Sequence, residues 1–186
     1  MKYFIPTALG TVILSATLAS NASAEPLPPG QVDFGTFTPP TSGVEFVEVN
    51  VTSSLISLAA HFIEKNEPEV AKLLNGLQLV HVNVIGVNDD NKADLESKAQ
   101  KIRKQLEGHG WERIVMAQQQ EQNVAVYLKT ENKDTVQGVV VTVMDGTKQA
   151  VFVNVVGNIK PEQLALIGDR LNIEPLKKLG HPAAEK

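Results

Sequence analysis

The four histidines of the chain are the first residues to test for metal chemistry. They are His61, His81, His109 and His181. No two of them stand at the short spacing that brings two ligands together on one helix face or turn, and the chain contains no cysteine. The sequence therefore predicts no metal site.

An acidic stretch supplies the oxygen ligands that calcium prefers. It runs from Asn88 to Asn91 and is followed by Asp94 and Glu96. The stretch lacks the glycine at the sharp turn and the distal glutamate of a calcium-binding loop. We interpret these residues as the cap of the helix that follows, because Asp and Asn are preferred at that position.

The side chains that could act in catalysis form no recognisable constellation. Ser53 and Ser54 stand beside a helix start rather than in a Gly-x-Ser-x-Gly turn, and Glu67 and Glu69 lie in a polar helix start. The chain has no phosphate-binding loop and no dinucleotide fingerprint. The sequence thus predicts no catalytic residue and no cofactor. An enzyme stays open as an alternative only if His81, Asn83 and a carboxylate from another element converge in a pocket.

Residues 1–24 have the pattern of a secretory signal peptide. Lys2 precedes an apolar stretch from Ile5 to Leu18, and Ala22-Ser23-Ala24 gives the small residues of a cleavage site. Pro6 and Gly10 interrupt the apolar run, which is shorter than the roughly 20 residues of a membrane span. We expect cleavage after Ala24, a periplasmic location in a Gram-negative envelope, and no membrane span afterwards.

Charge and composition exclude some function classes. The chain has 17 basic and 21 acidic residues, and the basic ones are mixed with acidic neighbours. A domain that binds nucleic acid normally shows a basic face, so we expect no nucleic-acid partner. Without cysteine the fold has no disulfides, and roughly 160 residues after cleavage are enough for one core.

Residues 25–43 form a segment rich in proline and glycine, which disfavour helices and central strands. Val32, Phe34 and Phe37 interrupt this composition. Large apolar side chains would serve no purpose in a spacer. We therefore expect this part of the segment to dock against the domain.

Regular hydrophobic patterns begin at Val44. They predict strands near 44–49, 77–87, 111–118, 123–129, 135–144 and 150–156, and helices from Ser53, from Pro68, after Asp90 or Asn91, and from Pro161. In the first helix, Leu55, Leu58, Ala59, Phe62 and Ile63 put an apolar stripe on one face. In the third, the stripe is formed by Leu95, Ala99, Ile102 and Leu106.

Short gaps between the last four strands require antiparallel neighbours. The element order then predicts an α+β fold, a two-layer sandwich of a largely antiparallel sheet of about five to six strands with helices on one face. The domain should span residues 44–179, with a loose tail at 180–186.

A sheet face that is left open would be a surface for a partner. Tyr127, Phe152 and Asn154 are the candidate residues, since aromatic and amide groups on a rigid sheet suit a protein or peptide. The alternative is that Phe152 belongs to the core and Tyr127 covers an edge. Homodimerisation through the same face is a third possibility.

Several segments together resemble one bacterial family. They are Pro29 to Gly35, Val47 to Val51, Leu106 to Glu112, Asn123 to Tyr127 and Val151 to Gly157. As a set they look like the domain-of-unknown-function family 4252, over nearly all of the chain after residue 24. The resemblance implies a small exported or envelope-associated domain. A regulatory role is implied by the genes for alternative sigma factors and their antagonists that often accompany family members.

The sequence as a whole favours an exported, non-enzymatic binding or regulatory domain. We expect it to act through protein–protein contacts in envelope signalling, with an envelope protein or a second copy as partner. A cryptic envelope enzyme or a small-ligand-binding protein is the alternative.

Overall fold

The computed structural model describes residues 27–40, 43–146 and 148–170. The predicted leader, the predicted cleavage site and the tail at 180–186 lie outside these residues. The described strands and helices follow one another as β1 (Phe46–Thr52), α1 (Ser53–Ile63), α2 (Pro68–Gly76), β2 (Leu77–Gly86), α3 (Lys92–Gly108), β3 (Glu112–Gln119), β4 (Gln122–Asn132), β5 (Thr135–Asp145), β6 (Gln149–Ile159), a 3-10 turn (Pro161–Gln163) and α4 (Leu164–Arg170).

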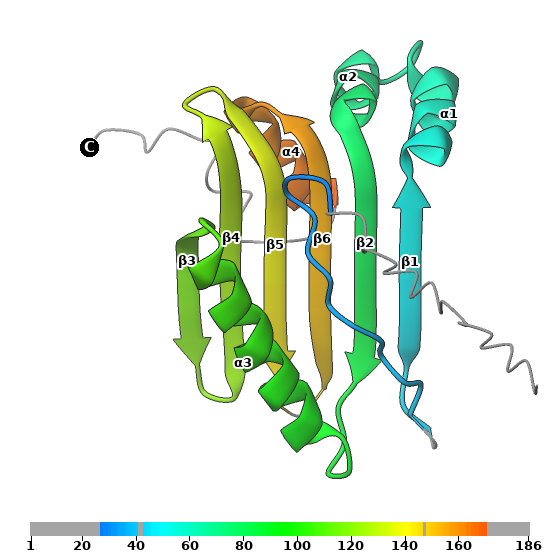
Figure 1. The fold of residues 1–186 in the computed structure, drawn as a ribbon. Helices are drawn as coiled ribbons and strands as arrows, with labels where there is room; N and C mark the ends of the chain where they lie inside the picture. Colours follow the sequence, from blue (N-terminus) through cyan, green and yellow to red (C-terminus); the bar gives the residue numbers. More distant parts are fainter. Residues whose placement is uncertain (1–26, 41–42, 147, 171–186) are drawn as a thin grey trace, which may run out of the picture.

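The six strands form one antiparallel sheet in the order β1-β2-β6-β5-β4-β3 (Figure 1). Strands β3 to β6 are neighbours in chain order, as their short connections predict. Strand β6 then pairs with β2, which is distant in sequence, and β1 and β3 become the two edges. The predicted α+β class is confirmed.

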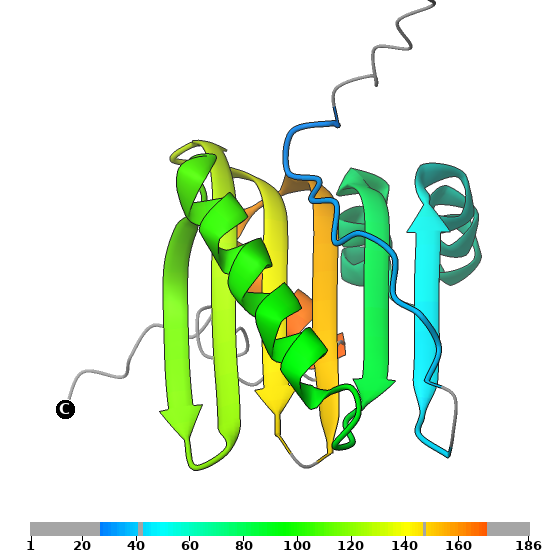
Figure 2. The ribbon, with the colours of Figure 1, turned by 60° about the horizontal axis from the view of Figure 1, so that its bottom comes forward.

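Helices lie on both faces of this sheet. Helix α3 and the N-terminal segment, residues 27–40, cover one side, which we call the α3 face (Figures 1 and 2). Helices α1, α2 and α4 lie toward the opposite side, the α4 face (Figure 2). The prediction that all helices share one face is therefore wrong.

The composition of β5 explains why both faces are covered. Val139, Val140 and Val141 follow one another, and all three are buried. Because side chains alternate along a strand, consecutive valines put apolar surface on both faces, and each face needs cover. On the α3 face the cover includes the predicted stripe of α3, whose four residues Leu95, Ala99, Ile102 and Leu106 are buried.

The N-terminal segment completes the cover of the α3 face. Val32 and Phe34 are buried in that core and Phe37 packs against it, so the predicted docking is confirmed. The backbone of the segment touches the sheet at Gly30, whose φ is 85°. A Cβ on Gly138 of β5 would lie 2.4 Å from the Gly30 carbonyl oxygen, so this contact requires glycine.

Candidate functional site

The three residues predicted to bind a partner, Tyr127, Phe152 and Asn154, lie together on the α3 face. All three are fully buried. The ring centroid of Phe37, from the N-terminal segment, lies 4.9 Å from that of Phe152. The hypothesis required this face to be open, and the structure closes it with α3 and the N-terminal segment. These residues are therefore core residues and offer a partner no surface.

Asn154 fastens the N-terminal segment to the sheet. Its Oδ1 atom accepts a hydrogen bond of 2.9 Å from the backbone N–H of Val32. Its Nδ2 atom donates to the carbonyl oxygens of Gly30 at 3.0 Å and Val139 at 3.2 Å. The amide thus satisfies two backbone groups of a segment that has no strand partner. This explains why a polar side chain is buried here.

The buried hydroxyl of Tyr127 leads to a test of its core role. Its Oη atom has no hydrogen-bond partner among the described residues. We expect Tyr127→Phe to leave the free energy of unfolding unchanged or to raise it by up to about 1 kcal/mol, because an unpaired buried polar atom costs stability. Tyr127→Ala should instead lose about 3–5 kcal/mol through the cavity it leaves. Urea unfolding measures both, and a clear loss in Tyr127→Phe would contradict this assignment.

A histidine and two polar neighbours do converge on the α3 face of β1 and β2. The Nε2 atom of His81 lies 2.9 Å from Nδ2 of Asn83 and 3.5 Å from Oε1 of Glu48. Glu48 is the register partner of Asn83 on the neighbouring strand. The three side chains therefore meet, but none of them lines the groove described below, so the convergence in a pocket that the enzyme alternative requires is not shown.

The geometry around His81 favours a structural role. When the Asn83 amide donates to Nε2, that nitrogen is an acceptor and its lone pair is occupied. A general base needs a free lone pair within reach of its substrate. The ring of Phe34 also lies over this position, with the two ring centroids 5.8 Å apart.

The acidic stretch before α3 is organised by asparagine side chains. Oδ1 of Asn88 accepts hydrogen bonds from the backbone N–H groups of Asp90 and Asn91, at 3.1 and 3.0 Å. The Asn91 side chain donates to the Gly86 carbonyl oxygen at 2.8 Å. Asn91 stands at the predicted N-cap position but makes no side-chain cap hydrogen bond to the helix; its Oδ1 accepts instead from the backbone N–H of Asn88 at 2.9 Å. Within the described residues no group of three His, Cys, Asp or Glu side chains could hold a metal ion.

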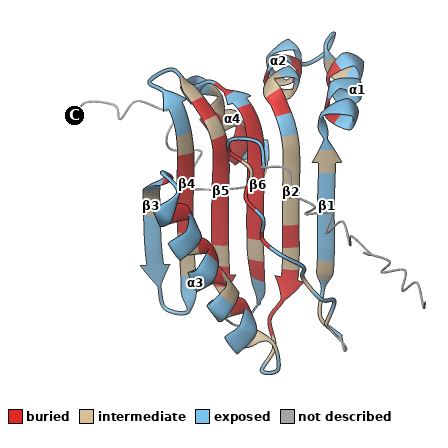
Figure 3. Cartoon of the chain, viewed as in Figure 1, coloured by how far each residue is buried: buried red, intermediate tan, exposed pale blue. Residues whose placement is uncertain are grey.

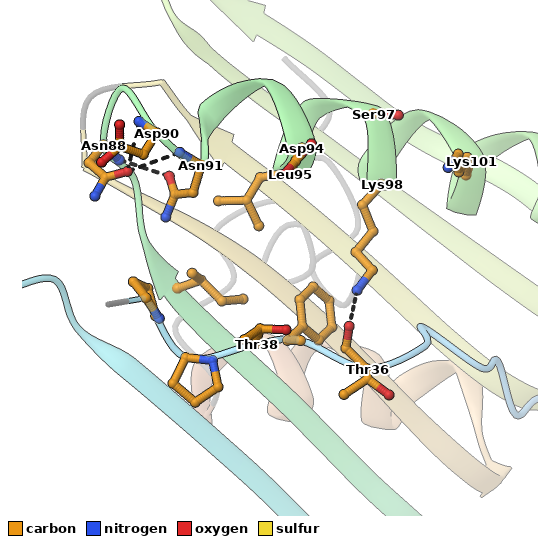
Figure 4. A pocket seen from close by; sticks show the side chains of 14 residues that line it. Thr36, Thr38, Asn88, Asp90, Asn91, Asp94, Leu95, Ser97, Lys98 and Lys101 are labelled. Atoms are coloured by element: carbon orange, nitrogen blue, oxygen red, sulfur yellow. Dashed lines mark hydrogen bonds between the residues drawn. The ribbon is translucent and has the colours of Figure 1, made fainter. Parts of the chain in front are cut away.

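A groove of about 520 Å³ lies between the N-terminal segment and the first half of α3 (Figure 4). Its apolar lining includes Phe37, Ile85 and Leu95. Charged side chains also line it, namely Asp90, Asp94, Lys98 and Lys101. An apolar floor with a few charged groups is typical of a small-ligand site.

Lys98 occupies one side of this groove. Its Nζ atom donates to the Thr36 carbonyl oxygen at 2.5 Å and lies 3.7 Å from the centroid of the Phe37 ring. Burial lowers the pKa of Lys98 from its usual value, opposed by the nearby Asp33 carboxylate. Lys98 therefore already serves to hold the N-terminal segment, which leaves Lys101 as the more available cation for a ligand.

The largest concentration of exposed apolar side chains lies at the β1 edge. Of the seven large apolar side chains exposed in the described part of the chain, five belong to β1 and α1, namely Val47, Val49, Leu55, Leu58 and Phe62. We call these five the edge patch. Phe62 is the most exposed of the seven, at 73 %. Figure 3 shows how exposed β1 and α1 are beside the buried centre of the sheet.

The structure shows that the predicted apolar stripe of α1 is not the side of the helix that faces the core. Ile56 and Ala60 are the buried residues of α1, whereas Leu55, Leu58 and Phe62 point away from the core. Helix α1 is thus apolar on two sides. Spacing alone does not show which of two apolar sides faces the core.

Residues 42–167 match the family model described as Domain of unknown function (DUF4252). The chain belongs to this family. No curated protein and no solved structure gave a match. The DUF4252 match contains all six strands and the whole edge patch, and it begins after the N-terminal segment at 27–40. None of the described helices is long and apolar enough to cross a bilayer.

Proposed function

We propose that this chain is an exported, non-enzymatic binding domain that acts through protein–protein contacts in envelope signalling, and that the edge patch is its contact surface. The observation that carries this proposal is the concentration of five exposed apolar side chains on two consecutive elements. Soluble domains expose single apolar residues without consequence, whereas contiguous apolar patches mark interaction sites.

The composition of α1 supports a protein contact. His61 is the only ionisable residue of the helix, whose sequence is SSLISLAAHFI. A helix that is apolar on two sides normally lies inside a protein or an assembly. The helix lies beside an edge strand, which can accept a further strand by backbone hydrogen bonds. Location in the envelope rests on the leader pattern of residues 1–24.

The groove beside α3 supports a second candidate, a small-ligand-binding protein. Its apolar floor and the Lys101 side chain suit an amphipathic anion. The edge patch remains the better candidate, because Asp90 and Asp94 line the same groove and oppose an anion there.

The proposal predicts that a photo-crosslinking amino acid at Phe62 captures a protein in the intact envelope. We expect p-benzoylphenylalanine at this position to give discrete adducts, and the same residue at Gln119, exposed on β3, to give none. Phe62→Asp should weaken the same contact by at least about tenfold, because it removes an exposed aromatic anchor. Its circular-dichroism spectrum should remain that of the native chain, because Phe62 is a surface residue whose side chain is outside the core.

The chain is expressed with its own residues 1–24, and adducts are identified by mass spectrometry. Equal adducts at Phe62 and Gln119, or none at either position, would contradict the proposed surface.

A further inference from the structure

We infer that the partner at the edge patch is a second copy of this chain, joined by antiparallel pairing of the two β1 strands about a two-fold axis at Val49. This inference rests on the proposed function and names its partner. It differs from dimerisation through the α3 face, since that face is closed by α3 and the N-terminal segment.

The two edges of the sheet differ in how open they are to a further strand. Strand β3 is interrupted by a register shift between Arg113 and Val115 and begins with the charged pair Glu112 and Arg113. Bulges and charges of this kind protect an edge from pairing. Strand β1 pairs with β2 without interruption over its seven residues, contains no lysine, arginine or proline, and has Glu48 as its one charged residue. Strand β1 is therefore the edge that can be extended.

The β1 sequence fits its own copy in one register. With a two-fold axis perpendicular to the sheet, the α3 faces of both copies lie on the same side of the joined sheet. Only the register centred on Val49 pairs all seven residues of β1 with the seven residues of the other copy. It sets Val49 against Val49 of the partner copy, and Glu48 against Asn50 of the partner copy. The register centred one residue earlier would set the two Glu48 carboxylates against each other, which destabilises a strand pair.

Helix α1 is placed to cover the joined strands. In both views it projects past β1, on the side away from β2 (Figures 1 and 2). Phe46 of β1 packs against the core on the α3 face. Side chains alternate along a strand, so Val47, Val49 and Val51 face the opposite side, where α1 lies. In the dimer, α1 of each copy therefore overlies the first half of the other copy's β1.

This arrangement explains which apolar side chains are exposed in one copy. Val51, at the end of β1 next to α1, packs against the core on the α4 face. Val47 and Val49, farther from that helix, are each 38 % exposed. The other copy's α1 would bring Leu55, Leu58 and Phe62 toward these two valines. One contact thus covers all five residues of the edge patch.

The charge pattern favours a second copy over a different protein. A two-fold contact sets a surface against itself, so any charge near the axis meets its own sign. The five residues of the edge patch are uncharged. Glu48, the one charged residue of β1, points to the opposite face, where its direct neighbour in this register is Asn50 of the partner copy rather than a second Glu48. A different partner would gain specificity from complementary charges, which this surface does not offer.

Cysteine scanning tests the register directly, because the natural chain has no cysteine. Residues directly opposite in an antiparallel pair have Cα atoms about 4.5–5.5 Å apart, within the range that a disulfide spans. We expect V49C to form at least about tenfold more covalent dimer under mild oxidation than M116C, a matched variant on the exposed β3 edge. Sedimentation of the native full chain should show a dimer, and Leu58→Glu should convert it to a monomer.

The outcomes separate this inference from the proposed function. Equal crosslinking of V49C and M116C, or a native chain that sediments only as a monomer, would overturn the homodimer. If the Phe62 photo-crosslink then yields an identified different protein, the proposed function stands and the self-partner falls. If Phe62 yields no adduct at all, both fall. A Leu58→Glu variant that keeps the native circular-dichroism spectrum and unfolds cooperatively, at a lower melting temperature because the dimer no longer stabilises it, shows that loss of the dimer is not loss of the fold.

Discussion

Replacing Phe34 by alanine should lower the free energy of unfolding by about 3–5 kcal/mol, the usual cost of removing a buried phenylalanine. Phe34 is 3 % exposed and lies between the rings of His81 and Phe152, with centroid distances of 5.8 and 6.1 Å. It is the central anchor of the N-terminal segment. The melting temperature should fall by roughly 6–20 °C, since about 1 kcal/mol shifts a domain of this size by 2–4 °C.

Leu27→Ala is the matched control for this variant. Leu27 belongs to the same segment but is 49 % exposed, so its truncation should change stability by no more than about 0.5 kcal/mol. Thermal unfolding followed by circular dichroism compares the two variants. Equal and small effects would show that the segment adds little to the stability of the sheet.

The sequence predicts the elements of this fold well, because their patterns are local. The stripe of α3 repeats at helical spacing, and the four strands after it are separated by short turns, so their existence and antiparallel pairing follow. The docking of Val32, Phe34 and Phe37 is also predictable, since three large apolar residues stand in a proline-rich segment.

The layers of the fold are harder to predict. Consecutive valines in β5 signal a strand that is buried on both faces, but a single strand does not tell which elements provide the cover. The segment that covers β6 on the α3 face is extended rather than helical. Asn154 binds the backbone of this segment, and every residue type offers the same backbone groups, so the sequence does not show where this contact forms.

The pairings between distant elements could not be predicted either. His81 and Glu48 meet because β1 pairs with β2 across two intervening helices, and no turn fixes that register. The edge patch could not be predicted from the sequence for a related reason. Both sides of α1 are apolar, so only the packed structure shows that Ile56 faces inward and Phe62 outward.

Replacing Asn154 by alanine should cost about 2–4 kcal/mol, because it leaves buried backbone groups without their partner. The groups of the N-terminal segment affected are the Val32 N–H and the Gly30 carbonyl. The melting temperature should fall by roughly 5–15 °C. Asn158→Ala, an exposed asparagine on the same strand, should be close to neutral. Hydrogen exchange should speed up first at Val32, since its amide loses its acceptor.

A double-mutant cycle then separates loss of the segment from general damage to the core. If Asn154 acts by fastening the segment, its loss releases Phe34 as well, and Phe34→Ala should cost clearly less in the Asn154→Ala background than in the native chain. Additive losses would mean that Asn154 and Phe34 stabilise the sheet independently, which would contradict the fastening role. The same cycle with Ile167 should be additive, because Ile167 belongs to the separate core cluster on the α4 face, which includes no residue of the N-terminal segment.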